Sequence, residues 1–127
     1  MKLSHIYKPI ILQMEFIDPY TDEKTGIFLK FHSIRSFFGK VKLHEIQLKN
    51  IEMQEKGEEI DNIAINKELL INLFDSFSGL EDDDGKTIES SKKSFEAAIN
   101  ESQELLNACL VFVSNSGNSS RKLEKDL

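Results

Sequence analysis

The sequence predicts an α+β fold that is mainly helical, with an N-terminal β-hairpin followed by a long helix and a bundle of three or so helices. Apolar and polar residues alternate up to residue 32, which is the period of a half-buried strand, and beyond residue 33 the apolar residues recur at helical spacing. The 127 residues, of which 39% are hydrophobic, provide apolar side chains for one core but not for two. We therefore expect a single globular domain over residues 1–115.

Two segments near the N-terminus have the pattern of paired strands. Residues 10–17 (IILQMEFI) and 26–32 (GIFLKFH) both alternate, and the segment between them is rich in turn-forming residues. Alternate side chains along both strands are expected to face the core: Leu12, Met14, Phe16, Ile27, Leu29 and Phe31.

A long helix is expected over residues 34–54, with Ser33 as its N-cap and Gly57 near its end. Gly39 lies inside it and costs about 1 kcal/mol relative to alanine, so a kink or break could occur there. The main apolar stripe of this helix consists of Ile34, Phe37, Phe38, Val41, Leu48 and Ile51.

A second apolar patch projects about 100° to 180° away from Ile34 on the same helix. Either the closing helices cover this patch, or it is exposed and binds a protein partner or a second copy of the chain. Lysines flank it as a polar rim. The candidate protein-binding site comprises six residues: Leu43, Ile46, Met53, Lys40, Lys42 and Lys49.

The second half of the chain predicts further helices. One covers residues 63–77, one follows a Ser90 or Ser91 cap and continues through Ile99, and one covers residues 102–113. The DDDG sequence at residues 82–85, followed by KTI, predicts a tight turn that carries a short strand. Residues 116–127 have no apolar period, so we expect a disordered polar tail.

Composition excludes several classes of function. The net charge of −6 disfavours nucleic-acid binding, which requires basic surface. The longest apolar runs fall far short of the roughly 20 residues needed to span a bilayer, and the N-terminus lacks a signal-peptide cleavage site. Cys109 lies in an apolar run and is expected to be an inert core residue. These observations favour a cytoplasmic protein that binds neither nucleic acid nor membrane.

Motifs for catalysis or metal binding are missing from the sequence. His5, His32 and His44 are far apart, and Leu48 occupies the position of the second histidine of an HExxH motif. The acidic run resembles the front of an EF-hand loop, but with Gly85 at the sixth position the first and twelfth positions hold Leu80 and Ser91. We expect no catalytic residues, no metal site and no cofactor, and hence no enzyme.

Charge is distributed unevenly along the chain. Residues 30–56 carry six basic and three acidic side chains, whereas residues 57–89 carry ten acidic side chains and two lysines. Opposed charged surfaces of this kind can pair within an oligomer, can steer a partner, or can simply keep the surface solvated.

Four features follow one another in a fixed order: the segment 18–31 (DPYTDEKTGIFLKF), the serine at position 33 before a long charged helix, the segment 73–91 (LFDSFSGLEDDDGKTIESS), and a final helix before a polar end. This order resembles the tail assembly chaperones of long-tailed bacteriophages. Members tend to carry a tryptophan or phenylalanine, then Gly-Leu, then an acidic-Asp-Gly turn. The matching positions are Phe77, Gly79, Leu80, Asp84 and Gly85.

The resemblance implies a non-enzymatic assembly factor. Such a protein binds the tail tube protein, the tape measure protein or both in the cytoplasm of an infected or prophage-carrying host, can form a homo-oligomer, and is absent from the mature virion. The alternative is an acidic protein inhibitor or nucleic-acid-mimicking regulator of phage or plasmid origin, which would use the acids of residues 58–89.

Calcium binding should be weak, because Leu80 and Ser91 replace the two strongest carboxylate ligands of an EF-hand loop. Calorimetry with calcium should therefore give only small heats. A dissociation constant below about 10⁻⁵ M, the range of calcium sensors, would contradict this expectation.

Overall fold

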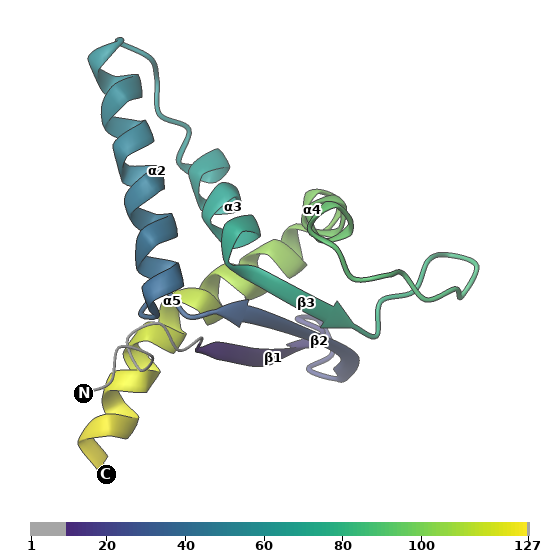
Figure 1. Cartoon of the computed structure of the whole chain (residues 1–127). Coiled ribbons are helices and arrows are strands. Elements are labelled where there is room, and N and C mark those ends of the chain that lie inside the picture. Colours follow the sequence, from purple (N-terminus) through teal and green to yellow (C-terminus); the bar gives the residue numbers. More distant parts are fainter. Residues whose placement is uncertain (1–9, 127) are drawn as a thin grey trace.

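The alternating N-terminal segment forms the predicted β-hairpin (Figure 1). The computed structural model describes the backbone of residues 10–126 and the side chains of residues 10–115, so His5 lies outside it. Strands β1 (Ile11–Ile17) and β2 (Lys24–His32) pair antiparallel, with Met14 opposite Leu29. Leu29 and Phe31 are buried and the other predicted inward-facing residues are half-buried, so the expected core face of the hairpin is confirmed.

A third strand, which the sequence did not predict, completes the sheet. β3 (Phe74–Ser78) pairs antiparallel with β2, and the sheet order is β1-β2-β3. The helix expected over residues 63–77 is therefore wrong in its last turn: α3 (Asn62–Leu73) ends where β3 begins. Phe74 and Phe77 are three residues apart, as in a helix, but the pairing with β2 skips Asp75, and this bulge lets a strand bury both rings.

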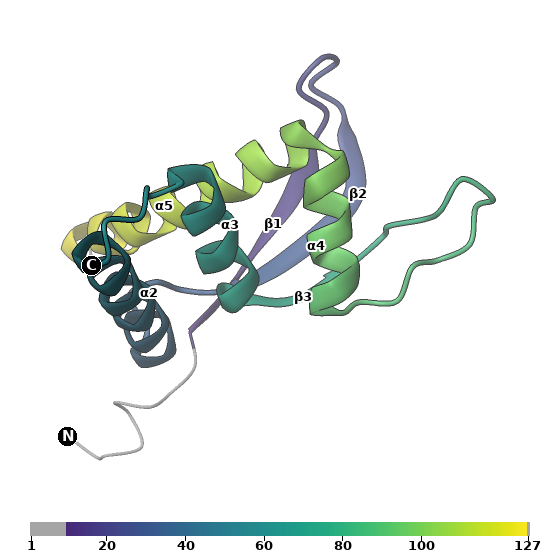
Figure 2. The ribbon, with the colours of Figure 1, turned by 90° about the horizontal axis from the view of Figure 1, so that it is seen from above.

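Helices cover one face of the sheet, as Figures 1 and 2 show. α4 (Lys92–Glu101) and α5 (Gln103–Asp126) lie beside α3, so the fold is α+β and mainly helical, as predicted. Phe74 stacks on Phe95 with ring centroids 4.3 Å apart, and Phe31 meets Phe95 edge-on at 5.6 Å. The buried core draws on the last two strands and on α3, α4 and α5: Leu29, Phe31, Leu70, Leu73, Phe74, Phe77, Phe95, Ile99, Leu105, Leu106, Cys109 and Val113.

Helix α4 begins as the sequence predicts. The Ser91 hydroxyl accepts a hydrogen bond from the Ser94 amide at 3.0 Å, and the Ser94 hydroxyl accepts one from the Ser91 amide at 3.1 Å. This reciprocal capping satisfies two amides that the helix leaves without an intrahelical partner. Helix α5 continues to Asp126, beyond the end predicted at residue 113. The side chains beyond residue 115 lie outside the described part, so the disorder expected of residues 116–127 stays a prediction.

Helix α2 (Phe37–Glu55) begins three residues later than predicted. Its N-cap is Ser36, whose hydroxyl accepts from the Gly39 amide at 3.0 Å and donates to the Ser33 carbonyl at 2.6 Å. Gly39 therefore lies in the first turn rather than in the middle of the helix. A Cβ atom at this position would collide with the Ser33 carbonyl oxygen, so the close approach of the chain entering α2 requires glycine.

The buried and the exposed apolar faces of α2 are the reverse of those predicted from the sequence. Figure 1 shows α2 and α3 side by side, and Lys49 of α2 pairs with Glu68 of α3 at 3.3 Å. Ile46 is only 4% exposed, whereas Leu48 and Ile51, which were expected to face the core, are 53% and 52% exposed. The face that includes Ile46 therefore packs inward, against α3.

We expect Ile46→Ala to reduce the free energy of unfolding by about 2–4 kcal/mol, because a buried aliphatic side chain is truncated. Leu48→Ala on the same helix is the matched control, and should cost less than about 1 kcal/mol because Leu48 is half exposed. Urea unfolding at low protein concentration measures both values. Equal losses would contradict the assignment of faces.

Candidate protein-binding surfaces

The six residues of the predicted binding site do not form one exposed patch. Ile46 is buried, and Leu43 and Met53 are half-buried on the same side of α2, so these three serve the packing of the helix within the chain. Of the two alternatives that the sequence left open, exposure is therefore wrong for Ile46, and the helix that lies against α2 is α3 rather than the closing helices.

The three lysines of that site are distributed around α2. Lys42 lies 5.5 Å from the ring centroid of Phe38 and pairs with Glu45 at 3.6 Å. Lys49 makes the ion pair with α3, and Lys40 is exposed. Lysine side chains thus border both the covered and the open sides of the helix.

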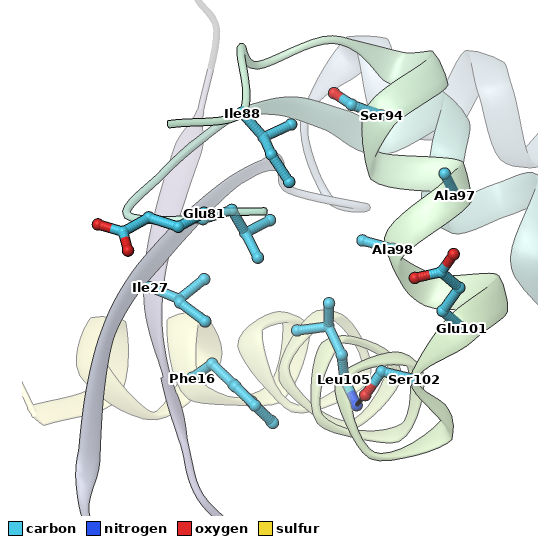
Figure 3. A pocket seen from close by; sticks show the side chains of 11 residues that line it. Phe16, Ile27, Glu81, Ile88, Ser94, Ala97, Ala98, Glu101, Ser102 and Leu105 are labelled. Carbon is cyan, nitrogen blue, oxygen red and sulfur yellow. Dashed lines mark hydrogen bonds between the residues drawn. The ribbon is translucent and has the colours of Figure 1, made fainter. Parts of the chain in front are cut away.

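An apolar hollow of about 520 Å³ lies beneath α4 (Figure 3). We call it the α4 pocket. It lies between the hairpin, the arms of the acidic turn, α4 and the start of α5, and Figure 3 shows Ile27, Ile88 and Leu105 converging on it. Its lining residues are Phe16, Ile27, Leu80, Glu81, Ile88, Ser94, Ala97, Ala98, Glu101, Ser102 and Leu105. The volume is in the range of about 300–1,000 Å³ that is typical of ligand pockets.

The polar groups of the α4 pocket divide into two kinds. The hydroxyls of Ser94 and Ser102 take part in the capping of α4 and α5: Ser94 donates to the Glu89 carbonyl at 2.8 Å, and Ser102 accepts from the Leu105 amide at 3.1 Å. Glu81 and Glu101 are exposed carboxylates from opposite sides of the hollow. The pocket therefore combines an apolar lining with an acidic rim.

A second hollow, the β1–α5 groove, adjoins the first. It has a volume of about 560 Å³ and lies between the edge strand β1 and the outer side of α5. Phe16, at the bulge of β1, lines both hollows, so the two adjoin at this side chain. The groove is lined by Met14, Glu15, Phe16, Ile17, Pro19, Glu104, Asn107, Ala108, Val111, Phe112 and Asn115.

The β1–β2 turn is joined to α5 at the end of this groove. The Tyr20 hydroxyl donates a hydrogen bond to the Glu104 carboxylate at 2.8 Å. This bond stabilises the charged carboxylate and lowers the pKa of Glu104. The same hydrogen bond, together with the negative charge of Glu104, raises the pKa of Tyr20. The contact is exposed to solvent, so it positions the turn rather than stabilising the fold strongly.

The cysteine and the histidines that were considered for metal or redox chemistry either pack within the protein or lie on its surface. Cys109 is fully buried, and burial raises the pKa of its thiol to about 12, which confirms the expectation of a core residue. His32 stacks on Phe38 with ring centroids 4.2 Å apart, while His44 is exposed on α2. Among the described residues, no three His, Cys, Asp or Glu side chains are grouped to hold a metal ion.

The acidic run forms a tight turn, as predicted. The Asp82 carboxylate accepts hydrogen bonds from the amides of Asp84 and Lys86, both at 2.9 Å. The backbones of Glu81 and Thr87 form an isolated antiparallel β-bridge. Asp82 is therefore engaged in holding the turn.

Comparison with protein families, curated proteins and solved structures finds no match to this chain. Within the helices that the structure describes, none is both long and apolar enough to cross a membrane. The two hollows were not predicted from the sequence, because their walls come from segments far apart in the chain. A local signal for the α4 pocket is the pair Ala97 and Ala98, because their small side chains leave space beside α4.

The pKa of Glu104 should rise in a Tyr20→Phe variant, because the carboxylate loses its main hydrogen-bond donor. Since the pKa is lowered in the folded state, this contact adds stability above the ordinary pKa of glutamate and loses it as the pH falls through the folded value. NMR titration of the Glu104 carboxyl measures the change. An unaltered pKa would show that the hydrogen bond does not form in solution.

Proposed function

We propose that this protein is a non-enzymatic tail assembly chaperone of the bacteriophage type, which binds the tail tube protein, the tape measure protein or both during virion assembly in the host cytoplasm. The observation that carries the proposal is the pair of adjoining apolar hollows, the α4 pocket and the β1–α5 groove. Open apolar surface of this kind commonly marks a site for a protein partner.

Residues that carry the resemblance to this family also shape the surface. Leu80 lines the α4 pocket. Phe77, in the strand β3 that leads to Leu80, is buried in the core. Gly79 has φ +84° and lies so close to the Gly26 carbonyl that a side chain there would collide with it. Phe77 and Gly79 therefore help to place Leu80 at the pocket, whereas the acidic-Asp-Gly turn lies beyond the pocket lining.

The chemistry of the pocket favours binding over catalysis. Its two serine hydroxyls are engaged in helix capping, and its remaining polar side chains are exposed carboxylates. An apolar side chain of a partner would enter the pocket, and a neighbouring lysine or arginine of that partner would lie near Glu81 and Glu101.

Ala97→Glu tests this proposal, because Ala97 is exposed at the pocket and a larger charged side chain would fill the space without removing a core contact. The variant should fold normally and bind the tail tube or tape measure protein at least about tenfold more weakly in co-purification and titration calorimetry.

Ala64→Glu is the matched control, since Ala64 is an exposed alanine on α3, away from the α4 pocket. It should bind like the unaltered chain. The proposal fails if neither partner binds the unaltered chain, or if both variants bind equally well.

A further inference from the structure

Helix α2 carries an apolar stripe on the side opposite α3. Val41, Leu48 and Ile51 are 38%, 53% and 52% exposed, and His44 lies among them. We call these four residues the outer stripe. Figure 1 shows α2 at one edge of the molecule, beside α3. The buried Ile46 and the ion pair of Lys49 with Glu68 mark the side of α2 that faces α3, and the outer stripe lies on the opposite side of the helix.

The outer stripe has the spacing of a coiled-coil seam. Its residues are separated by three, four and three positions, which puts Val41 and Leu48 at a positions and His44 and Ile51 at d positions of a heptad. A single helix packed on a single core needs only one apolar face, and the face around Ile46 already supplies that contact. A seam on the opposite side fits a second helix.

The charged residues beside the seam indicate that the second helix is α2 of another copy of this chain. In a parallel pair of α2 helices, Lys40 at a g position would face Glu45 of the other copy at an e position, and this contact occurs twice by symmetry. Gln47 would likewise face Glu52. In an antiparallel pair centred on the stripe, Glu45 would face Glu45 of the other copy and Lys40 would gain no acidic partner.

We propose that two copies of this chain associate through the outer stripes of their α2 helices, aligned in parallel. The helix is already held straight by α3, so pairing does not have to pay for helix formation. Its 19 residues span only about 28 Å, so the interface is small and the dimer is reversible. This association uses a surface separate from the α4 pocket and does not depend on the proposed partner.

Sedimentation velocity of the full chain over a range of concentrations tests the association. The unaltered chain should shift from monomer to dimer as its concentration rises, and Leu48→Glu should stay monomeric because it places a charge in the seam. Ile63→Glu is the matched control: Ile63 is 65% exposed on α3 and lines neither of the two hollows, so its replacement should leave the dimer intact. Circular dichroism should show that both variants are folded.

A charge exchange tests the alignment. Lys40→Glu and Glu45→Lys should each weaken the dimer, and the double variant should restore it, because the exchanged charges again face each other in parallel. Ile51→Cys should form a disulfide-linked dimer under mild oxidation, whereas the buried Cys109 should not react. An antiparallel pair would keep the two introduced thiols about 15 Å apart, too far for a disulfide.

The proposal is overturned if the unaltered chain remains monomeric at all concentrations, or if Leu48→Glu dimerises like the unaltered chain. It is also overturned if the outer stripe binds only a different protein. Failure of the double charge variant to recover, together with no crosslink at position 51, would reject the parallel alignment. A monomer that still binds a tail protein through the α4 pocket would reject self-association and leave the proposed function standing.

Discussion

The stacking of Phe74 on Phe95 is the contact on which the rest of the structure depends. The two rings lie 4.3 Å apart and 2° from parallel, and Phe31 packs against both from the central strand. Such aromatic contacts combine a large buried area with a defined geometry. Because Phe74 must reach this cluster from the first position of β3, α3 has to end at Leu73, and the bulge at Asp75 then returns Phe77 to the same face.

The arrangement of α2 follows from this constraint. Since α3 ends directly before β3, its other end is carried away from the core. α2 contacts the body of the protein through α3, through the turn at Ser33 and through the packing of Phe38 on His32 of β2. Gly39 secures that turn by allowing the Ser33 backbone to approach the helix. One side of α2 is thereby covered, and its opposite side remains an apolar surface with the spacing of a coiled coil.

The sequence predicted correctly those elements that are marked by one local pattern. The hairpin and the capped start of α4 were found because alternation and serine capping are local signals. The strand Phe74–Ser78 was missed, since a bulge gives its phenylalanines the spacing of a helix. The prediction exchanged the buried and the exposed faces of α2, because periodicity alone does not distinguish between two apolar stripes on one helix. Gly39 was expected inside the helix because its requirement, the close approach of the Ser33 backbone, depends on how the chain enters α2 and leaves no periodic signal.

The two open surfaces differ in the kind of partner they can accept. The outer stripe of α2 is flanked by both a base and acids, so it can complement a copy of itself, whereas the α4 pocket has an acidic rim and cannot. A surface with one sign of charge requires a partner of different composition. Figure 1 places α2 and α4 on different sides of the molecule, so occupation of one surface leaves the other accessible. Two chains joined through α2 would then present two α4 pockets, and a partner with repeated binding segments would be held more tightly than by one chain alone.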